Sequence, residues 1–579
     1  MFKISLTKLV LPLTFALGVM LSSCAQPAAQ PTQQEKSPDQ QSQSAPRKGG
    51  EITLIIPEEP TLLNVYLTDA AIARQVADAT SQTGLVEIDT QGNVRPKLAE
   101  SLPSRENGGV SEDYKTITWK LRPNLKWSDG KPLTSDDVKF TWEAVTNPQS
   151  GVLYIGGFDK IESIETPDER TVVVKYKEPY AAYQTQFYYG IFPRHATGDP
   201  AKMGEWEWNR KPVGAGPYIV TEWNAGESIV MERNPYYYEE GKPYLDRLIF
   251  KVVPEPSAQT ALMMQGDAHV HLWPSESSEE YNKLLKGVAE LNMIPGIWNM
   301  AIDFNLSNPN DDDPSAKEPH PILGDLRVRQ AIAHAVDYDT LSPTVVKDTD
   351  PSTNPFAYGW FKCDIPRKYP YNVEKAKQLL TEAGWVEGTD GIRVAKGAKY
   401  AKDGTRLSLE MIGYTNFEPL QKTEEFIAEN LKAVGIETRI QNVDFSIIFG
   451  SFTEGAPSKL GKFDMTIYDR GFYYDPSGQI KNRYYSKNIP SAENPNGNND
   501  KRWVNPDVDR LIDESELTFE LSKRKEMYCQ IGQAIVDEIP ELYLYLFKDG
   551  YGFNNKLHGY ELNTWGSMTW DVQNWWMEE

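Results

Sequence analysis

Two histidines are the residues of this chain whose spacing comes closest to metal chemistry. His269 and His271 flank Val270, so on a strand both imidazoles would face one side, as a nickel or zinc pair requires. Two ligands are too few for a site, the chain holds only 6 His, and no cysteine cluster adjoins the pair. We therefore expect no bound metal.

Catalytic motifs are incomplete in the same way. The run Gly214-Ala215-Gly216 lacks the third glycine of a dinucleotide-binding loop and lies between strand-like segments, where glycines serve turns. Residues 522–525 match Ser-x-x-Lys at the start of a charged helix, but the companion motifs of penicillin-binding proteins are missing from the sequence. A His-Glu-x-x-His motif and a P-loop lysine are missing as well. We therefore expect that the chain is not an enzyme and binds no cofactor. A secreted hydrolase is a distant alternative.

The first residues of the chain predict export. Lys3 and Lys8 precede an apolar run over residues 9–21, which ends at the tetrapeptide Leu21-Ser22-Ser23-Cys24. A helix needs about 20 apolar residues to span a bilayer, so residues 1–24 predict a cleaved secretory signal that ends in a lipobox. Cys24 would become the mature N-terminus and carry a diacylglycerol, whose acyl chains hold the protein to a membrane. Residues 25–48, rich in Gln, Pro, Ser and Ala, predict a disordered tether.

Composition describes the remainder of the chain. Roughly 530 residues follow the tether, which corresponds to about two or three domains. Hydrophobic residues make up 40% of the sequence, and 15 Trp and 30 Tyr supply both cores and binding surfaces. The net charge of −22, about −24 without the two leader lysines, argues against a nucleic-acid partner. Export permits a disulfide between Cys363 and Cys529, while two separate buried thiols are equally compatible with the sequence.

Hydrophobic periodicity predicts an α/β fold with mixed sheets. Residues 116–121 alternate polar and apolar side chains as a half-buried strand does, and Thr134 with Asp137 comes close to a capping box for the next helix. Residues 407–441 predict a strand, a helix and a second strand, which together form a parallel βαβ unit. The composition changes at residues 305–317, where we expect a domain change.

A series of short motifs follows in one order over nearly the whole chain. They are LAES (98–101), WKLRP (119–123), KWSDGKPLT (126–134), VGAGPY (213–218), ERNPYY (232–237), KPYLD (242–246), QGD (265–267), DLRVRQAI (325–332), KAKQLLTEAGW (375–385) and NPDVD (505–509). In this order they resemble the peptide-, nickel- and oligosaccharide-binding class of ABC transporter proteins called extracellular solute-binding protein family 5.

The resemblance implies a fold of the periplasmic-binding-protein type II kind, with two hinged lobes and a smaller inserted domain. The first lobe would comprise residues 49–88, 195–293 and 541–579, the inserted domain residues 89–194, and the second lobe residues 294–540. The lobes would close on an oligopeptide or similar solute and deliver it to a permease, whose ATPase partners consume the ATP. We expect a monomer, exported and lipid-anchored at the outer face of the cytoplasmic membrane or in the periplasm.

Ligand contacts are implied by position in the family. They would come from the loop after the first strand, the segment after residues 265–267, the crossing between the lobes, and the loop at residues 469–476. The residues indicated are Asn64, Trp273, Trp298, Arg470, Phe472, Tyr473 and Asp475. Trp273 and Trp298 are equally compatible with roles as core aromatics. Arg470 could clamp a carboxylate or phosphate, or form a structural salt bridge.

The loop at residues 469–476 departs from the family pattern. Peptide-binding members carry an aspartate three residues before the acidic-Pro pair, where it neutralises the α-ammonium of the peptide. Phe472 stands at that position here, so Asp469 or Asp475 takes the role only if the loop is offset. An oligosaccharide or an opine-like solute is therefore a second hypothesis, which the Tyr and Trp content suits. A ligand sensor without a transporter is a third.

Overall fold

The computed structural model describes residues 45–578, apart from residues 69, 154–155 and 312–317. The predicted leader, the lipidation site Cys24 and most of the predicted tether lie outside the described residues. From Pro46 onward the described chain forms one compact unit. In that part of the chain, no helix combines the length and the apolar character that a membrane crossing demands.

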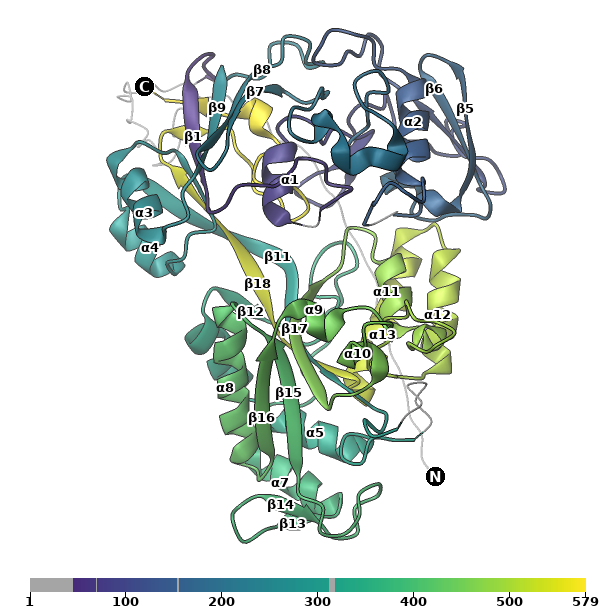
Figure 1. Cartoon of the computed structure of the whole chain (residues 1–579), viewed down its shortest axis with the longest axis vertical. Coiled ribbons are helices and arrows are strands. Elements are labelled where there is room, and N and C mark those ends of the chain that lie inside the picture. Colours follow the sequence, from purple (N-terminus) through teal and green to yellow (C-terminus); the bar gives the residue numbers. More distant parts are fainter. Residues whose placement is uncertain (1–44, 69, 154–155, 312–317, 579) are drawn as a thin grey trace, which may run out of the picture. The chain divides into compact units, whose positions relative to one another are not determined.

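An 11-stranded mixed sheet is the framework of this unit (Figure 1). Its strands are β1 (Glu51–Ile56), β7 (Tyr218–Asn224), β8 (Ser228–Arg233), β9 (Arg247–Val252), β10 (Val270–Leu272), β11 (Ala289–Phe304), β12 (Thr349–Pro351), β15 (Ser408–Tyr414), β16 (Glu437–Val443), β17 (Met465–Gly471) and β18 (Glu541–Asn554). The order is β16-β15-β17-β11-β18-β10-β1-β9-β8-β7, with β12 paired to β18 beside this path. Parallel pairs, such as β15 with β16, and antiparallel pairs, such as β11 with β18, occur together. The predicted mixed sheet is therefore confirmed.

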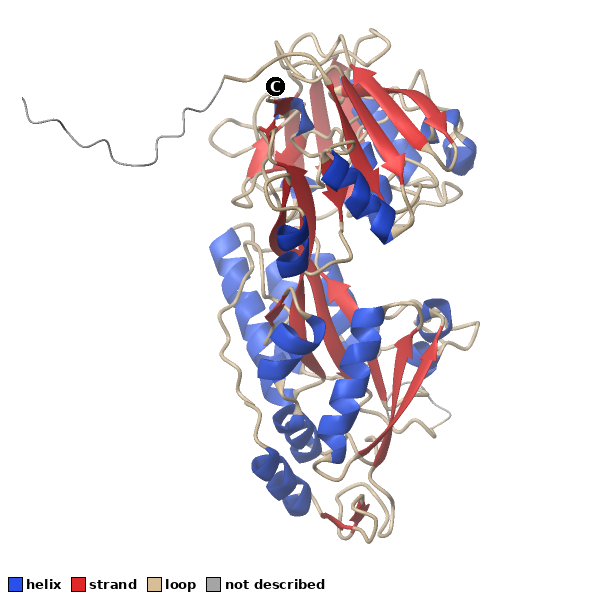
Figure 2. Cartoon of the chain, turned by 90° about the vertical axis from the view of Figure 1, so that its left-hand side faces the viewer, coloured by secondary structure: helices blue, strands red, loops and turns tan. Residues whose placement is uncertain are grey.

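Helices are distributed along the whole described chain among the strands (Figure 2). They are α1 (Ala71–Ala77), α2 (Ser135–Val145), α3 (Pro256–Gln265), α4 (Ser278–Leu284), α5 (Leu326–Ala335), α6 (Tyr338–Thr340), α7 (Val373–Glu382), α8 (Glu418–Lys432), α9 (Phe445–Phe449), α10 (Pro457–Leu460), α11 (Ser477–Tyr484), α12 (Pro506–Glu516) and α13 (Leu521–Glu538). The helix α8 packs against β15 and β16, and this arrangement confirms the parallel βαβ unit predicted at residues 407–441.

The two long strands β11 and β18 connect the halves of the sheet. They pair in antiparallel fashion from Ala289 opposite Asn554 to Asp303 opposite Glu541. The strand β11 also pairs with β17, on the side of β15 and β16, and β18 also pairs with β10, on the side of β1, β9, β8 and β7. The pair of β11 and β18 therefore joins these two halves of the sheet. The pairing of β11 with β18 is interrupted by two register shifts, one between residues 295 and 299 and one between residues 300 and 301. Segments far apart in the sequence are thereby brought to the same place.

A smaller, three-stranded antiparallel sheet lies outside this framework. It contains β4 (Thr116–Lys120), β6 (Thr171–Tyr176) and β5 (Ile161–Asp168), in that order. The capping box predicted for the next helix is confirmed at α2, where the Asp137 carboxylate accepts the Thr134 N–H at 2.9 Å. The remaining strands form two-stranded pairs: β2 (Val86–Ile88) with β3 (Val94–Pro96), β13 (Trp385–Glu387) with β14 (Arg393–Ala395), and β19 (Leu557–His558) with β20 (Trp576–Met577).

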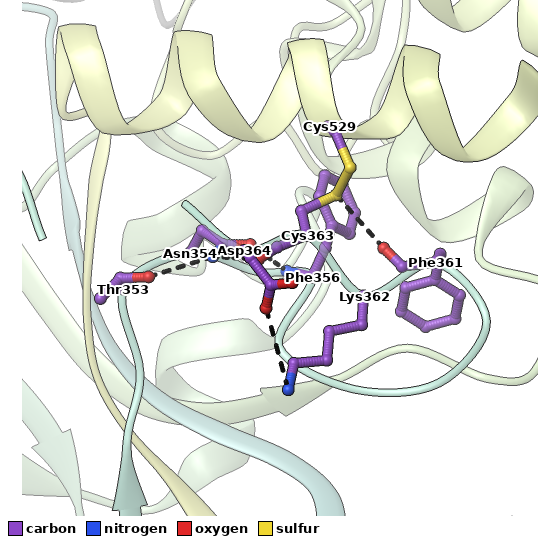
Figure 3. Close-up of a disulfide and its surroundings, with 8 residues drawn as sticks. All are labelled: Thr353, Asn354, Phe356, Phe361, Lys362, Cys363, Asp364 and Cys529. Atoms are coloured by element: carbon purple, nitrogen blue, oxygen red, sulfur yellow. Dashed lines mark hydrogen bonds and ion pairs between the residues drawn. A yellow bond between two sulfur atoms is a disulfide. The ribbon is translucent and has the colours of Figure 1, made fainter. Parts of the chain in front are cut away.

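A disulfide joins Cys363 to Cys529 (Figure 3). Cys363 lies in the loop that follows β12, and Cys529 lies in α13, 166 residues further along the chain. The sequence left a disulfide and two free thiols equally open, and the structure shows the disulfide. The bond fixes this loop to the helix that carries Arg524, a residue of the cavity described below.

Candidate functional site

A cavity of about 610 Å³, which we call the main cavity, is the candidate binding site. Its walls come chiefly from residues 156–160, 180–189, 473–482 and 564–565, and Arg74 of α1 lies among them. A volume of this size falls within the range of about 300–1,000 Å³ that is usual for small-ligand sites. Chain segments hundreds of residues apart therefore meet around one space that can hold a solute.

Aromatic side chains form much of the wall. They are Tyr66, Phe158, Tyr180, Tyr188, Tyr189, Tyr473, Tyr474 and Trp565. The rings brace one another edge to face, with centroids 5.3 Å apart for Tyr188 and Tyr189 and 5.3 Å apart for Tyr474 and Trp565. Burial raises the pKa of Tyr189 to about 12, so its hydroxyl stays neutral at physiological pH. Such walls offer flat apolar faces with polar tips, which suit peptide side chains and sugar rings alike.

A second cavity, of about 760 Å³, adjoins the first, and Thr564 and Trp565 line both. Its other walls are mainly polar residues from the loop at residues 350–366. The Tyr474 hydroxyl, in the main cavity, donates to the carbonyl of Gly92, which lines the second, at 2.8 Å. We take the main cavity as the candidate site because the aromatic walls are concentrated there.

Tyr473 and Asp475, both indicated by the sequence, line the main cavity. The Asp475 carboxylate accepts hydrogen bonds from Arg524 at 2.8 and 2.9 Å and from the Ser477 hydroxyl at 2.6 Å. Burial opposes ionisation of Arg524, but the charge and hydrogen bonds of Asp475, together with Tyr528, raise the arginine pKa. The negative charge of Asp475 is therefore already matched within the protein.

The other predicted ligand contacts are not among the residues that line the main cavity. Asn64 is buried, and its amide donates to the Asn209 side chain at 3.0 Å. Phe472 packs in an apolar cluster beside Phe356, and its N–H donates to the Tyr358 hydroxyl at 2.6 Å. Their role in ligand binding stays a prediction.

The two predicted tryptophans also lie apart from this wall. Trp298 belongs to β11, and the residue is 40% exposed. Trp273 follows β10 in a left-handed conformation, with φ of 51°, and packs half-buried against the apolar core around β1. A role of either tryptophan in ligand binding stays a prediction, because neither lines the main cavity.

Arg470 belongs to a buried network of charges. Its guanidinium pairs with Asp303 and, at 2.9 Å, with Glu541, and its side chain is 1% exposed. Lys501 joins the network at 3.3 Å from Glu541. Although burial opposes ionisation of Glu541, the charges of Lys501 and Arg470 lower its pKa to about 2. Of the two roles open for Arg470, the structure therefore shows the structural salt bridge.

The histidine pair is engaged within the protein. His271 is fully buried with Nε2 at 3.0 Å from the Gln259 side-chain oxygen, and burial lowers its pKa to about 4. His269 accepts the Thr53 N–H at its Nδ1. Among the described residues, no group of three or more His, Cys, Asp or Glu side chains is placed to hold a metal ion.

Sequence reasoning missed Arg74, Tyr188 and Trp565, which lie together in the cavity wall. Arg74 and Trp565 are hydrogen-bonded although 491 positions separate them in the chain. Residues 180–189 are rich in tyrosine, and this local pattern could have indicated a candidate binding surface. The position of Arg74 had no such pattern.

Comparison with known proteins gives one consistent result. The family described as bacterial extracellular solute-binding proteins, family 5 middle, matches residues 93–491. The oligopeptide-binding protein AppA of Bacillus subtilis (strain 168) is 26% identical over 582 residues, which cover 98% of each chain. A putative ABC transporter peptide-binding protein of Brucella ovis is 27% identical over 78% of this chain and 79% of its own.

Solved structures agree. The structure of AppA in complex with a nonapeptide has a TM-score of 0.70 at 25% identity, and the match covers 92% of this chain and 100% of that one. NikZ from Campylobacter jejuni, in complex with Ni(L-His), has a TM-score of 0.71 at 23% identity, with 91% and 99% covered, and supports the fold alone. The predicted periplasmic-binding-protein type II fold and the resemblance in the sequence motifs are thus confirmed, and the chain belongs to the bacterial extracellular solute-binding proteins of family 5.

Proposed function

We propose that this chain is the substrate-binding component of an ABC importer and that it captures an oligopeptide in the main cavity. The observation that carries the proposal is the composition of that cavity. Its walls come from the predicted inserted domain (residues 156–189), the predicted second lobe (residues 473–482) and the C-terminal segment (residues 564–565). A solute held there touches all three regions, so its binding energy favours the arrangement in which they meet.

Two observations bear on the class of solute. The relative AppA, matched over 98% of both chains, is named for binding oligopeptides, which favours a peptide. Phe472 and the neutralised Asp475 favour the second candidate, an oligosaccharide or an opine-like acid, because neither offers a free carboxylate to a peptide ammonium. The protein AgaA, solved in complex with agropinic acid, shares the fold at a TM-score of 0.65.

Thermal unfolding with a solute panel tests the proposal. The chain from Pro46 onward is heated with peptides of two to nine residues, with oligosaccharides, with opines and with Ni²⁺. A ligand present at a hundred times its Kd stabilises the folded state by about 2.7 kcal/mol. A rise of the midpoint with peptides supports a peptide importer, and a rise with sugars or opines alone transfers the proposal to that class. No response from a folded protein would contradict solute capture and leave a sensor of another ligand.

Export and membrane attachment form a separate part of the proposal. The family consists of extracellular proteins, and the N-terminal sequence adds a cleaved signal with lipidation at Cys24. A monomer would then be held by its acyl chains at the outer face of the cytoplasmic membrane or in the periplasm, next to the permease and its ATPase subunits. In cells fed a labelled fatty acid, Cys24→Ser should lose the label and leave the membrane fraction. Label retained on the variant would exclude Cys24 as the site.

Absence of catalysis is also proposed, in keeping with the ligand-binding role of the family. Incubation of the purified chain with the peptides and oligosaccharides of the panel should return every compound intact. Hydrolysis that persists through repeated purification would revive the hydrolase alternative.

A further inference from the structure

Positive charges in the main cavity are mostly matched by neighbouring carboxylates. Lys160 lies 3.8 Å from Glu516, and Lys481 is ion-paired to the same carboxylate. Arg524 is paired with Asp475 at 2.8 Å. Three of the four described cations that line the cavity therefore have a partner of opposite charge.

Arg74 is the fourth, and the described residues provide no ion pair for it. Its Nη2 donates to the Tyr188 hydroxyl at 2.6 Å and to the carbonyl of Trp565 at 2.5 Å. The Arg74 Nε is enclosed without an acceptor, whereas Nη1 is neither enclosed nor bonded to any described residue. Both acceptors of Nη2 are neutral, and Arg74 is one of the residues that line the cavity. The cavity wall thus contains a cationic side chain with an open N–H donor.

The surroundings keep Arg74 charged. Burial opposes its ionisation, but neighbouring groups, the Asp78 carboxylate among them, together raise the arginine pKa. A cation withdrawn from water with no carboxylate in ion-pair contact is costly, and the cost falls when an anion reaches it. Guanidinium donors match the two oxygens of a carboxylate in geometry as well as in charge.

A purely structural role accounts for only part of this arrangement. The bonds from Nη2 tie α1 to Tyr188 and to Trp565 near the C-terminus, and the guanidinium lies 5.6 Å from the Tyr188 ring centroid. Arg122 provides a comparison, since it also donates to a backbone carbonyl, that of Lys97, and lies 5.5 Å from the ring of Tyr238. Arg122 does not line the cavity. What distinguishes Arg74 is that it lines the cavity and keeps an unbonded Nη1 donor.

We propose that Arg74 recognises an anionic group of the solute, so that the natural ligand presents a carboxylate to the main cavity. This inference rests on the proposed solute-binding function and adds the chemical class of the ligand. A peptide C-terminus, an acidic side chain of a peptide, and a uronic or opine-like acid all supply that group. The source is left to the experiment, whereas the requirement for negative charge is common to all three.

The test compares matched ligands that differ in one negative charge. One pair is a pool of nonapeptides without Asp or Glu, prepared as free acids and as C-terminal amides. A second pair consists of amidated pools with and without acidic side chains, and a third of trigalacturonate and galactotriose. Thermal unfolding and titration calorimetry are performed on the chain from Pro46 onward, with the original sequence and with Arg74→Met, Arg74→Lys and Arg122→Met.

The original sequence should bind the acidic member of at least one pair about 10- to 100-fold more tightly than the neutral member, the usual effect of a hydrogen bond to a charged group. Arg74→Met should abolish this preference, Arg122→Met should retain it, and Arg74→Lys should retain it at weaker affinity. If Arg74→Met does not fold, Arg74→Lys provides the test, because its affinity for the acidic member should be weaker than that of the original sequence. The pair that shows the preference identifies the source of the carboxylate.

Two outcomes overturn the inference while leaving solute binding intact. One is equal affinity of the original sequence for acidic and neutral members, and the other is an acid preference that survives in Arg74→Met. A folded protein that responds to no member of any pair has a different meaning, because the proposed function then fails and the inference fails with it.

Discussion

Replacing Arg470 by methionine should lower the free energy of unfolding by about 3 kcal/mol. Removing one partner from a buried ion pair costs about 3–5 kcal/mol, because the remaining charge stays in a medium that solvates it poorly. Here the loss leaves two carboxylates, Asp303 and Glu541, each with a side chain no more than 1% exposed. Lys501 remains 3.8 Å from Asp303 and 3.3 Å from Glu541 and compensates in part, so we expect the lower end of that range.

Urea unfolding measures this change as a shift of the midpoint at constant slope, since the surface exposed on unfolding is the same in both proteins. Arg406→Met is the matched control. Arg406 also bonds two carboxylates, Asp390 at 2.6 Å and Glu437 at 3.0 Å, but its side chain is 41% exposed. Water and salt screen such a pair, and its removal should move the midpoint very little.

Two results would refute this reasoning. A midpoint shift as small as that of the Arg406 control would mean that the buried network contributes little to stability. A variant that unfolds at the original midpoint but no longer responds to its ligand would make Arg470 a ligand contact instead of a structural cation. Arg470→Lys, which keeps the charge, should recover part of the lost stability.

The remaining predictions concern a buried acid, the disulfide and the cavity wall. Burial raises the pKa of Glu424 to about 7 against a hydrogen bond from Asn442, so the stability it contributes below pH 4.5 is lost as the pH rises through 7. Glu424→Gln should reduce this loss, seen as a smaller difference between urea midpoints at pH 5 and pH 8, and an unchanged difference would contradict the assignment. Dithiothreitol should destabilise the chain by about 2–5 kcal/mol through reduction of the bond between Cys363 and Cys529, whereas the double alanine variant should not respond. Trp565→Ala should lower the affinity of any ligand bound in the main cavity, because it removes an aromatic side chain from the wall. If calorimetry finds the same affinity as for the original sequence, the ligand binds elsewhere.

Elements with a local cause were predictable from the sequence. The unit β15-α8-β16 is one such case, because β15 carries buried apolar side chains and the helix that follows it carries its own apolar stripe. The capping box at Thr134 and Asp137 is another, since a cap depends on residues three positions apart. The capping box joins residues that are neighbours in the chain, and β15, α8 and β16 are consecutive elements, so local patterns carry the information.

Pairings between distant segments were outside the reach of such patterns. The register that places Ala289 opposite Asn554 depends on which strands meet, and neither strand specifies its partner by composition. The same limit applies to Arg470, whose type suited a ligand clamp and a salt bridge equally well. The choice between them required the positions of Asp303 and Glu541, which lie 167 and 71 residues away.

Asp475 shows why the ligand class was harder to predict than the family. The sequence revealed that Phe472 replaces the expected aspartate, and it left Asp469 or Asp475 as a substitute that depended on the local fold. Arg524, 49 residues further on, neutralises Asp475, and Asp469 accepts a hydrogen bond from the Tyr414 hydroxyl and does not line the main cavity. Arg74 then remains as a cation without an ionic partner among the described residues of the wall. A motif can locate the binding site of such a protein, but the preferred charge of the solute follows from the charges that the folded chain leaves unmatched.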